Sequence, residues 1–363
     1  MSLQTGYLVL ESGEIFEGIF HEGEPRAGEV VFNTSHSGYE EIATDPSYFS
    51  QIVVMTSPMQ GNYGVDRACW ESRRVWIEGF ICLQMQASNR DHGWGQRLSE
   101  GKIPCLTEVD TRAIAFRLRE GGTPWGALLS AQNSQEALKK AQTLITEKKK
   151  IDKDWVYSTS RKETEKRAGK VASGPRVAVL DFGAKENILR ELEALCSEVI
   201  IFPSRASAAE VLAVKPDGLM LTNGPGDPMD VQVAPETVRS LIGKLPIFGI
   251  CMGHQILGIS LGAKTYKLKF GHRGSNHPIR DDLLDQIYMT SQNHGYAVDG
   301  QSLPEDAKVT HTNLNDNTVA GFFSEKRNFL GIQYHPESHP GPHDAEGLFR
   351  FFVDKMIKKD KLK

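Results

Sequence analysis

The feature that most constrains the fold is an alternation of short apolar runs with helix-forming stretches in the second half of the chain. Between two of these runs, residues 185–195 place Ile188, Leu189 and Leu192 on one helical face. This alternation predicts an open parallel sheet with helices on both sides, and sites in such sheets lie beyond the carboxyl ends of the strands. The predicted strands are 177–180, 199–202, 219–221 and 247–250.

The first half of the chain is richer in strands and glycines than the second. A turn at Glu11–Glu14 separates two of its apolar runs. Near its end, Asn133 and Glu136 have the spacing of a capping box, and apolar residues follow at helical intervals, so we expect a surface helix there. The fold class is therefore α/β, with a β-rich N-terminal domain whose predicted strands are 7–10, 15–16, 30–33 and 51–56.

A charged segment separates the two halves. Residues 148–176 are rich in Lys and Arg, poor in aliphatic side chains, and end in Ala-Ser-Gly-Pro, which is the composition of a linker. We predict domains at 1–150 and 176–363, joined by a solvated linker at 151–175. The alternative interpretation of the charged segment is a basic docking patch.

Composition excludes several classes of protein. The chain has 363 residues, of which 39% are hydrophobic, enough for about two cores. The 42 basic and 46 acidic residues give a net charge of -4, without the basic excess of a nucleic-acid binder. The most apolar window, 246–262, is shorter than the roughly 20 residues that cross a bilayer, and no signal peptide is evident. We predict a cytoplasmic protein with no nucleic-acid or membrane partner.

Cysteine usage argues against structural cross-links. The five cysteines are an odd number and none has C-x-x-C spacing, so neither a disulfide framework nor a thiolate zinc site is expected. Cys251 has a different context, because Gly249-Ile250-Cys251-Met252-Gly253 follows an apolar strand and opens a helix. This G-x-C-x-G pattern is typical of a strained nucleophile elbow. We expect its sulfur to be exposed above the sheet edge, with the Met252 N–H facing a substrate oxyanion. The alternative is a buried structural cysteine.

A nucleophilic thiol needs a base, and that base needs an orienting group. His335 and Glu337 follow the apolar run 330–334 and would lie at the same sheet edge as Cys251. We predict His335 as the base and Glu337 as its orienting partner. His335, His339 and His343 also have the spacing of a metal-binding helix face, but three prolines interrupt that stretch, so no metal site is predicted.

The loop Asn223-Gly224-Pro225-Gly226-Asp227-Pro228 follows another predicted strand. Its N–H groups could face an anion or an oxyanion, and a plain turn is the alternative. The loop lacks the Lys-Ser/Thr ending of a phosphate-binding loop, so nucleotide binding is not indicated.

In combination these motifs resemble a known family. Residues 176–363 are similar to the glutaminase domain of the class I (triad) glutamine amidotransferases, which is a flavodoxin-like open-sheet domain. The motifs that carry this similarity are NGPGDP, GICMGHQ and HPE, in this order. The resemblance extends nearly end to end to the small subunits of carbamoyl phosphate synthetase. The additional segments that carry it are VVFNTSHSGYEEIATDPSYFSQIV, VLDFGAKENILREL, FGHRGSNHP, SQNHGYAV and SHPGPHDAEGLF.

The resemblance implies that Cys251 attacks the side-chain amide of L-glutamine, forming a γ-glutamyl thioester and releasing ammonia. His335 would protonate the departing amine and activate water, and Glu337 would hold the imidazole. Met252 and Gly224 would supply the oxyanion donors. The implied substrate-binding residues are Ser47, Gly224, Gly226, Met252, Gln255, Asn293, Gly295 and Tyr296.

The resemblance also implies a partner. A large subunit would bind ATP, Mg and bicarbonate, and would use the ammonia to make carbamoyl phosphate for arginine and pyrimidine biosynthesis. No cofactor is expected in this chain. Two alternatives remain open. One is another triad amidotransferase, of a nucleotide or anthranilate pathway, against which residues 1–160 argue. The other is a non-catalytic assembly subunit, against which Cys251, His335 and Glu337 argue.

Overall fold

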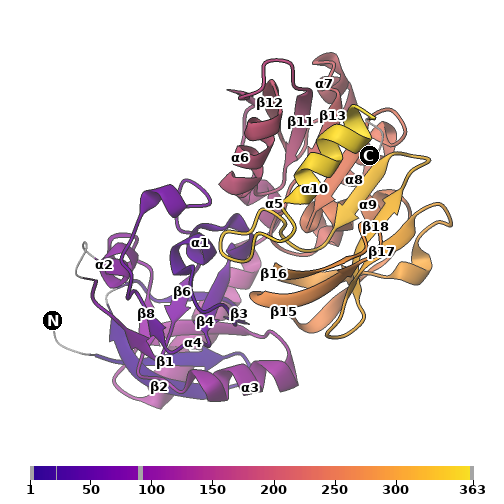
Figure 1. Cartoon of the computed structure of the whole chain (residues 1–363). Coiled ribbons are helices and arrows are strands. Elements are labelled where there is room, and N and C mark those ends of the chain that lie inside the picture. Colours follow the sequence, from indigo (N-terminus) through magenta and orange to yellow (C-terminus); the bar gives the residue numbers. More distant parts are fainter. Residues whose placement is uncertain (1–3, 22, 89–92, 360–363) are drawn as a thin grey trace. The chain divides into compact units, whose positions relative to one another are not determined.

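The protein forms two compact units, Met1–Lys153 and Asp154–Lys363. The computed structural model describes residues 4–21, 23–88 and 93–359 (Figure 1). No helix within these ranges is long and apolar enough to span a membrane.

The first unit is built on a closed barrel of mixed strands. Its antiparallel pairs include β1 and β2, whose connecting turn places Gly13 at a φ of 92°, a conformation that glycine adopts without strain. Around the barrel the order is β1 (Gln4–Leu10), β2 (Ile15–His21), β8 (Cys105–Thr107), β6 (Gly79–Ile81), β4 (Gln51–Met55), β3 (Arg26–Asn33) and β9 (Trp125–Ser130). The four strands predicted in this half are confirmed, whereas β6, β8 and β9 were not predicted.

Helices and short segments surround the barrel. The predicted surface helix is α4 (Ser134–Ile151), and Asn133 caps it by accepting a hydrogen bond from the Glu136 N–H at 3.0 Å. Its buried face packs on side chains of β1 and β9. The other elements are α1 (Tyr39–Thr44), η1 (Pro46–Tyr48), β5 (Met59–Gln60), η2 (Arg67–Cys69), β7 (Gln84–Met85), α2 (Gly93–Glu100) and α3 (Thr111–Gly121).

The second unit contains the predicted parallel sheet. Its parallel strands lie in the order β12 (Glu198–Pro203), β11 (Arg176–Asp181), β13 (Gly218–Leu221), β14 (Ile247–Ile250) and β19 (Phe329–Ile332). Numbered along the chain, these strands have the 2-1-3-4-5 order of flavodoxin-like sheets. The predicted fold class is therefore confirmed.

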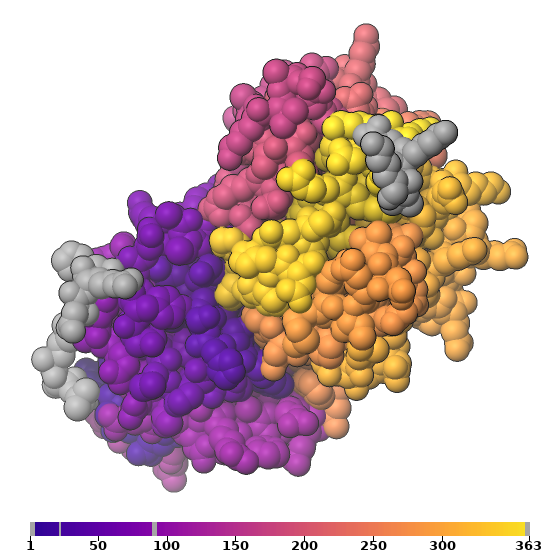
Figure 2. All heavy atoms as spheres, viewed as in Figure 1, coloured from indigo at the N-terminus to yellow at the C-terminus, as the bar shows by residue number. Residues whose placement is uncertain are grey.

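Helices cover both faces of this sheet. One face packs against α6 (Glu186–Leu195), α10 (Gly347–Arg350) and the π-helix η5 (Phe351–Ile357). The other face packs against α7 (Ala208–Ala213), α8 (Ala234–Leu241) and α9 (Met252–Ser260). Figure 2 shows the C-terminal helices, in yellow, on the surface. The helix predicted at 185–195 is α6, so that prediction is also correct.

An antiparallel extension beside β19 was not predicted. It consists of β18 (Val319–Ser324), β17 (Lys308–Asn313), β15 (Thr265–Asp281) and β16 (Gln286–Val298). The pairing of β15 with β16 is interrupted by two register shifts, so buried side chains do not alternate along β15. A strand with that burial pattern gives no period-two signal in the sequence.

The prediction of a solvated linker at 151–175 is wrong. The segment contains α5 (Trp155–Thr159) and β10 (Glu165–Ala168), and β10 pairs antiparallel with β12 at the sheet edge. Two of its arginines, Arg161 and Arg167, pair with Glu165 inside the segment and with carboxylates outside it. Arg161 lies 3.0 Å from Asp181, and Arg167 lies 3.2 Å from Glu193. Charge composition alone suggested a solvated segment because it shows neither the pairing of β10 with β12 nor the ion pairs with Asp181 and Glu193.

Candidate active site

Cys251 lies at the turn from β14 to α9. Its φ of 54° and ψ of -103° are strained for a residue with a side chain. The turn is fixed by two backbone hydrogen bonds. Cys251 N donates to Ile332 O at 2.8 Å, and Gly253 N donates to Thr222 O at 2.9 Å. The predicted strained elbow is therefore present.

The glycines on either side of Cys251 are required by close packing. A Cβ at Gly249 would lie 2.7 Å from Gly253 O, and a Cβ at Gly253 would lie 2.2 Å from Leu221 O. Both distances are shorter than carbon and oxygen atoms tolerate. The G-x-C-x-G spacing thus reflects a turn that can form only without side chains at these two positions.

His335 and Glu337 follow β19 at the same edge of the sheet. The backbone N–H of His335 donates to Ser291 O at 3.0 Å, which ties this segment to β16. The His335 Nδ1–H donates to Glu337 Oε1 at 2.7 Å. This bond leaves Nε2 of His335 available to Cys251, and Nε2 has no conventional hydrogen-bond partner among the described residues.

The surroundings of His335 and Glu337 favour the charged forms of both. Burial lowers the pKa of His335, but the Glu337 carboxylate and the neighbouring Cys251 outweigh that effect and raise the pKa to about 10. Burial raises the pKa of Glu337, yet the charges of Lys185 and His335 bring that pKa down to about 2. Within this buried cluster the imidazolium and the carboxylate stabilise each other.

Two further residues hold Glu337 and were assigned no role from the sequence. The Lys185 ammonium, only 2% exposed, lies 3.1 Å from Glu337 Oε1 and also donates to Ser338 O. The Asn187 side-chain amide donates to Glu337 O at 2.5 Å. Both residues belong to the segment VLDFGAKENILREL. The sequence feature that could have predicted the role of Lys185 is its position between a buried strand and a helix N-terminus, at the edge of the sheet where the site lies.

The prediction of an exposed sulfur is wrong. Cys251 is 2% exposed, and its Sγ lies 3.5 Å from Asn293 O on β16. The cover comes from the antiparallel hairpin of β15 and β16, which was not predicted and which brings Asn293 against the elbow.

The structure brings most of the predicted substrate residues to the same sheet edge. Among the described residues, no acceptor binds the N–H of Met252 or of Gly224, so both are available as oxyanion donors. The side-chain Nδ2 of Asn293, whose backbone O contacts the sulfur, is buried and has no hydrogen-bond partner in the described ranges. These three donors are free to meet a polar ligand.

The remaining predicted contacts have other surroundings. Gln255 Nε2 on α9 donates to Tyr296 O at 2.8 Å and to Gln333 Oε1 at 3.1 Å, so its amide already holds β16. Gly226 and Gly295 follow Gly224 and Asn293 by two residues along their segments. Ser47 lies on η1 of the first unit, and its contact with glutamine stays a prediction.

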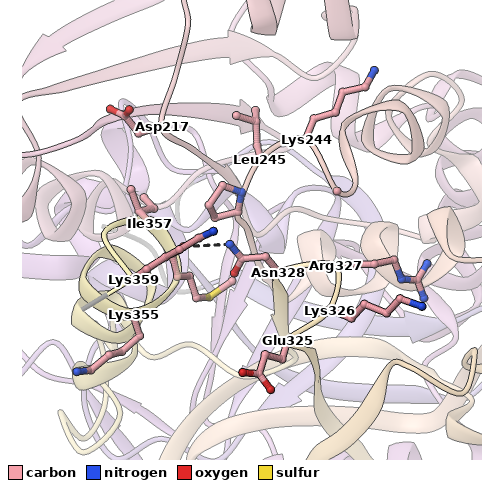
Figure 3. A pocket seen from close by; sticks show the side chains of 13 residues that line it. Asp217, Lys244, Leu245, Glu325, Lys326, Arg327, Asn328, Lys355, Ile357 and Lys359 are labelled. Atoms are coloured by element: carbon pink, nitrogen blue, oxygen red, sulfur yellow. Dashed lines mark hydrogen bonds between the residues drawn. The ribbon is translucent and has the colours of Figure 1, made fainter. Parts of the chain in front are cut away.

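A pocket of about 640 Å³ lies at the opposite edge of the sheet (Figure 3). The pocket is lined by the residues that directly precede the amino ends of β13, β14 and β19, which are Asp217, Pro246 and Asn328. Cys251 and His335 follow the carboxyl ends of β14 and β19. This pocket is therefore separate from the Cys251 cluster.

The sheet order, the elbow and the buried Cys-His-Glu cluster together define a class I glutamine amidotransferase domain. Residues 178–355 match the family described as Glutamine amidotransferase class-I, and residues 8–128 match the family described as Carbamoyl-phosphate synthase small chain, CPSase domain.

Relatives extend this similarity over almost the whole chain. The carbamoyl phosphate synthase small chain of Symbiobacterium thermophilum is 44% identical, over 95% of this chain and 96% of that protein. The Thermus thermophilus small chain is 42% identical, over 97% and 93%. The chloroplastic small chain of Arabidopsis thaliana is 42% identical, over 96% and 85%. The chain belongs to the carbamoyl phosphate synthase small chain family.

Lys185 provides a test of the buried cluster. Lys185→Met should raise the pKa of Glu337 and lower the free energy of unfolding by roughly 3–5 kcal/mol, because it removes one of the two cations that stabilise a buried carboxylate. Urea unfolding measures the change. The control is Lys170→Met, an exposed lysine of the same unit that should alter stability by less than about 0.5 kcal/mol. Equal stability of the two variants would contradict this role of Lys185.

A second prediction concerns the titration of His335. Its pKa is raised in the folded chain, so its contribution to stability is complete below the ordinary value of 6.5 and is lost as pH rises through about 10. Glu337→Gln should lower this pKa, because the neutral amide no longer stabilises the imidazolium. NMR titration of the protein with ring-labelled histidine measures the pKa of His335. The His335 resonance is identified as the one that is absent in His335→Asn. An unchanged pKa in Glu337→Gln would show that the carboxylate is not its source.

Proposed function

We propose that this chain is the glutaminase subunit of a glutamine-hydrolysing carbamoyl phosphate synthetase. The observation that carries the proposal is the placement of Cys251 on a strained elbow, with the His335 ring bonded to buried Glu337 on one side and facing Cys251 on the other. The family of the whole chain supports the specific reaction.

The residues of the second unit can carry out both halves of glutamine hydrolysis. The Cys251 thiolate adds to the side-chain amide carbon of glutamine, and the N–H groups of Met252 and Gly224 bind the resulting oxyanion. The carbon–nitrogen bond breaks as the imidazolium of His335 gives its proton to the departing nitrogen, so ammonia leaves and a thioester remains.

Water then completes the cycle. Neutral His335 accepts a proton from the water as its oxygen adds to the thioester carbon, and the carbon–sulfur bond breaks to release glutamate and restore the thiolate. Glu337 stays ionised throughout, because Lys185 and His335 lower its pKa to about 2. Its role is to orient the ring and stabilise the imidazolium.

The same proposal assigns a partner. Ammonia released at Cys251 passes to a large subunit that binds ATP, Mg and bicarbonate, while this chain itself carries no cofactor. We also propose a cytoplasmic location for this chain, although the Arabidopsis relative is named as chloroplastic.

The partner and the nucleophile can be tested in one assay. Cys251→Ser, assembled with the large subunit, should lose glutamine-dependent carbamoyl phosphate synthesis and keep ammonia-dependent synthesis, because only the amide-cleaving step needs the sulfur. The control Cys69→Ser changes a cysteine of the first unit and should keep both activities. Glutaminase activity retained by Cys251→Ser would remove the cysteine from the mechanism. Lack of glutaminase activity in the unmodified complex would instead favour a non-catalytic assembly subunit.

The roles of His335 and Glu337 predict an order of effects. His335→Asn removes the proton carrier, whereas Glu337→Gln removes only its orienting charge, so kcat should fall further in His335→Asn. Steady-state glutamine hydrolysis by the assembled complex measures both. If Glu337→Gln has the larger effect, the assigned roles are incorrect.

A further inference from the structure

Arginine side chains gather around a cavity in the first unit. The cavity has a volume of about 400 Å³ and lies where the end of α2 meets the loop that follows η2. We call it the arginine pocket, and it is lined by Arg26, Arg67, Arg73, Arg74 and Arg97, together with Trp70, Val75, Glu100, Gly101 and Ile103. These residues belong to the unit that does not contain Cys251, His335 or Glu337.

The positive charge of the arginine pocket is only partly balanced. Arg26 lies 3.3 Å from Glu78, a carboxylate that Lys148 also contacts at 2.5 Å. Arg97 lies 3.0 Å from Glu100. In the described part of the chain, no carboxylate lies within ion-pair distance of the remaining three arginines, Arg67, Arg73 and Arg74. The five guanidinium groups of the pocket therefore outnumber the carboxylates that pair with them, Glu78 and Glu100, and Glu78 is shared with Lys148.

Tryptophan rings hold these unbalanced arginines in place. The guanidinium carbon of Arg74 lies 3.9 Å from the ring centroid of Trp76, and that of Arg73 lies 5.7 Å from the same centroid. Arg67 lies 5.1 Å from the ring centroid of Trp70. A guanidinium that stacks through its face keeps its N–H edge free for a planar or tetrahedral oxyanion.

Two further observations favour anion binding at the arginine pocket. Burial, followed by the charge of Arg73, lowers the pKa of Arg74, so this guanidinium is partly desolvated beside a like charge. The Nε of Arg97 is buried and has no hydrogen-bond partner within the described ranges. Arg73 and Arg74 are neighbouring like charges at the rim of the pocket, and a bound anion would reduce their repulsion and accept a hydrogen bond from the Arg97 Nε.

We propose that the arginine pocket binds a small molecule carrying linked phosphate groups, of the pyrophosphate class. An arginine guanidinium binds phosphate oxygens through two N–H groups at once, and the excess of guanidinium groups over carboxylates matches a ligand that carries several negative charges in a small volume. A cavity of about 400 Å³ lies within the usual range of small-ligand sites. This binding does not depend on glutamine hydrolysis, so it can be present or absent whatever the outcome at Cys251.

The test is calorimetric titration of the full chain with sodium pyrophosphate at low ionic strength without divalent cations. The variant Arg73→Gln/Arg74→Gln should bind about tenfold or more weakly than the unmodified chain, because two charge-assisted contacts are lost. The matched control is Arg112→Gln/Arg119→Gln, which makes the same change of charge at exposed positions on α3 outside the pocket. The control should bind as the unmodified chain does.

Several results would overturn the proposal. One is a lack of pyrophosphate binding by the unmodified chain. Another is a loss of pyrophosphate affinity in the control variant equal to that in the pocket variant. A third is tighter binding of a glutamate-rich peptide than of pyrophosphate. The last result would assign the pocket to an acidic protein segment. The single variant Arg67→Gln, exposed on η2, repeats the test if the double variant unfolds. Pyrophosphate should also raise the thermal unfolding midpoint of the unmodified chain and of the control but not of the pocket variant.

Discussion

The chemistry of the second unit depends on a buried line of opposite charges that runs from Lys185 through Glu337 to His335 and Cys251. Each of the three charged partners would be destabilised by burial if it stood alone. Together they hold the imidazole in one orientation and favour its charged form, with Nδ1 bound to the carboxylate and Nε2 facing the sulfur. Loss of one member therefore affects the protonation of the others.

This line of charges exists because of the order of strands in the sheet. Lys185 comes from the loop after β11, Cys251 from the end of β14, and His335 from the end of β19. β14 and β19 are neighbours in the parallel sheet, and both end at the same edge. Residues separated by long stretches of sequence thus meet without a special connection between them, as expected for sites in open parallel sheets.

Some of this arrangement could be predicted from the sequence. The strands of the parallel sheet are short continuous apolar runs, and the elbow glycines mark positions where a Cβ would overlap with Gly253 O or Leu221 O. Cys251, His335 and Glu337 stand directly after such runs, so their common edge follows from the topology. The structure confirms the fold and the elbow, while the substrate contacts, Ser47 above all, remain predictions.

Other features could not be predicted from local patterns alone. Lys185 stands between a buried strand and a helix N-terminus, but the carboxylate that accounts for its burial lies far along the chain. The cover over Cys251 comes from β16, whose pairing with β15 is irregular, so the exposed sulfur expected for an elbow is in fact enclosed. The basic residues around 161–167 suggested a solvated linker because the strand that β10 pairs with, and two of the carboxylates that bind its arginines, Asp181 and Glu193, lie outside that segment.

The most direct test of the account is to trap the covalent intermediate that the Cys251 sulfur is proposed to form. The assembled enzyme would be mixed with glutamine, quenched in acid during turnover, digested and analysed by peptide mass spectrometry. The account predicts a γ-glutamyl group on the peptide that contains Cys251 and on no other cysteine peptide. Release of glutamate without any adduct on Cys251, or an adduct on a different residue, would contradict it.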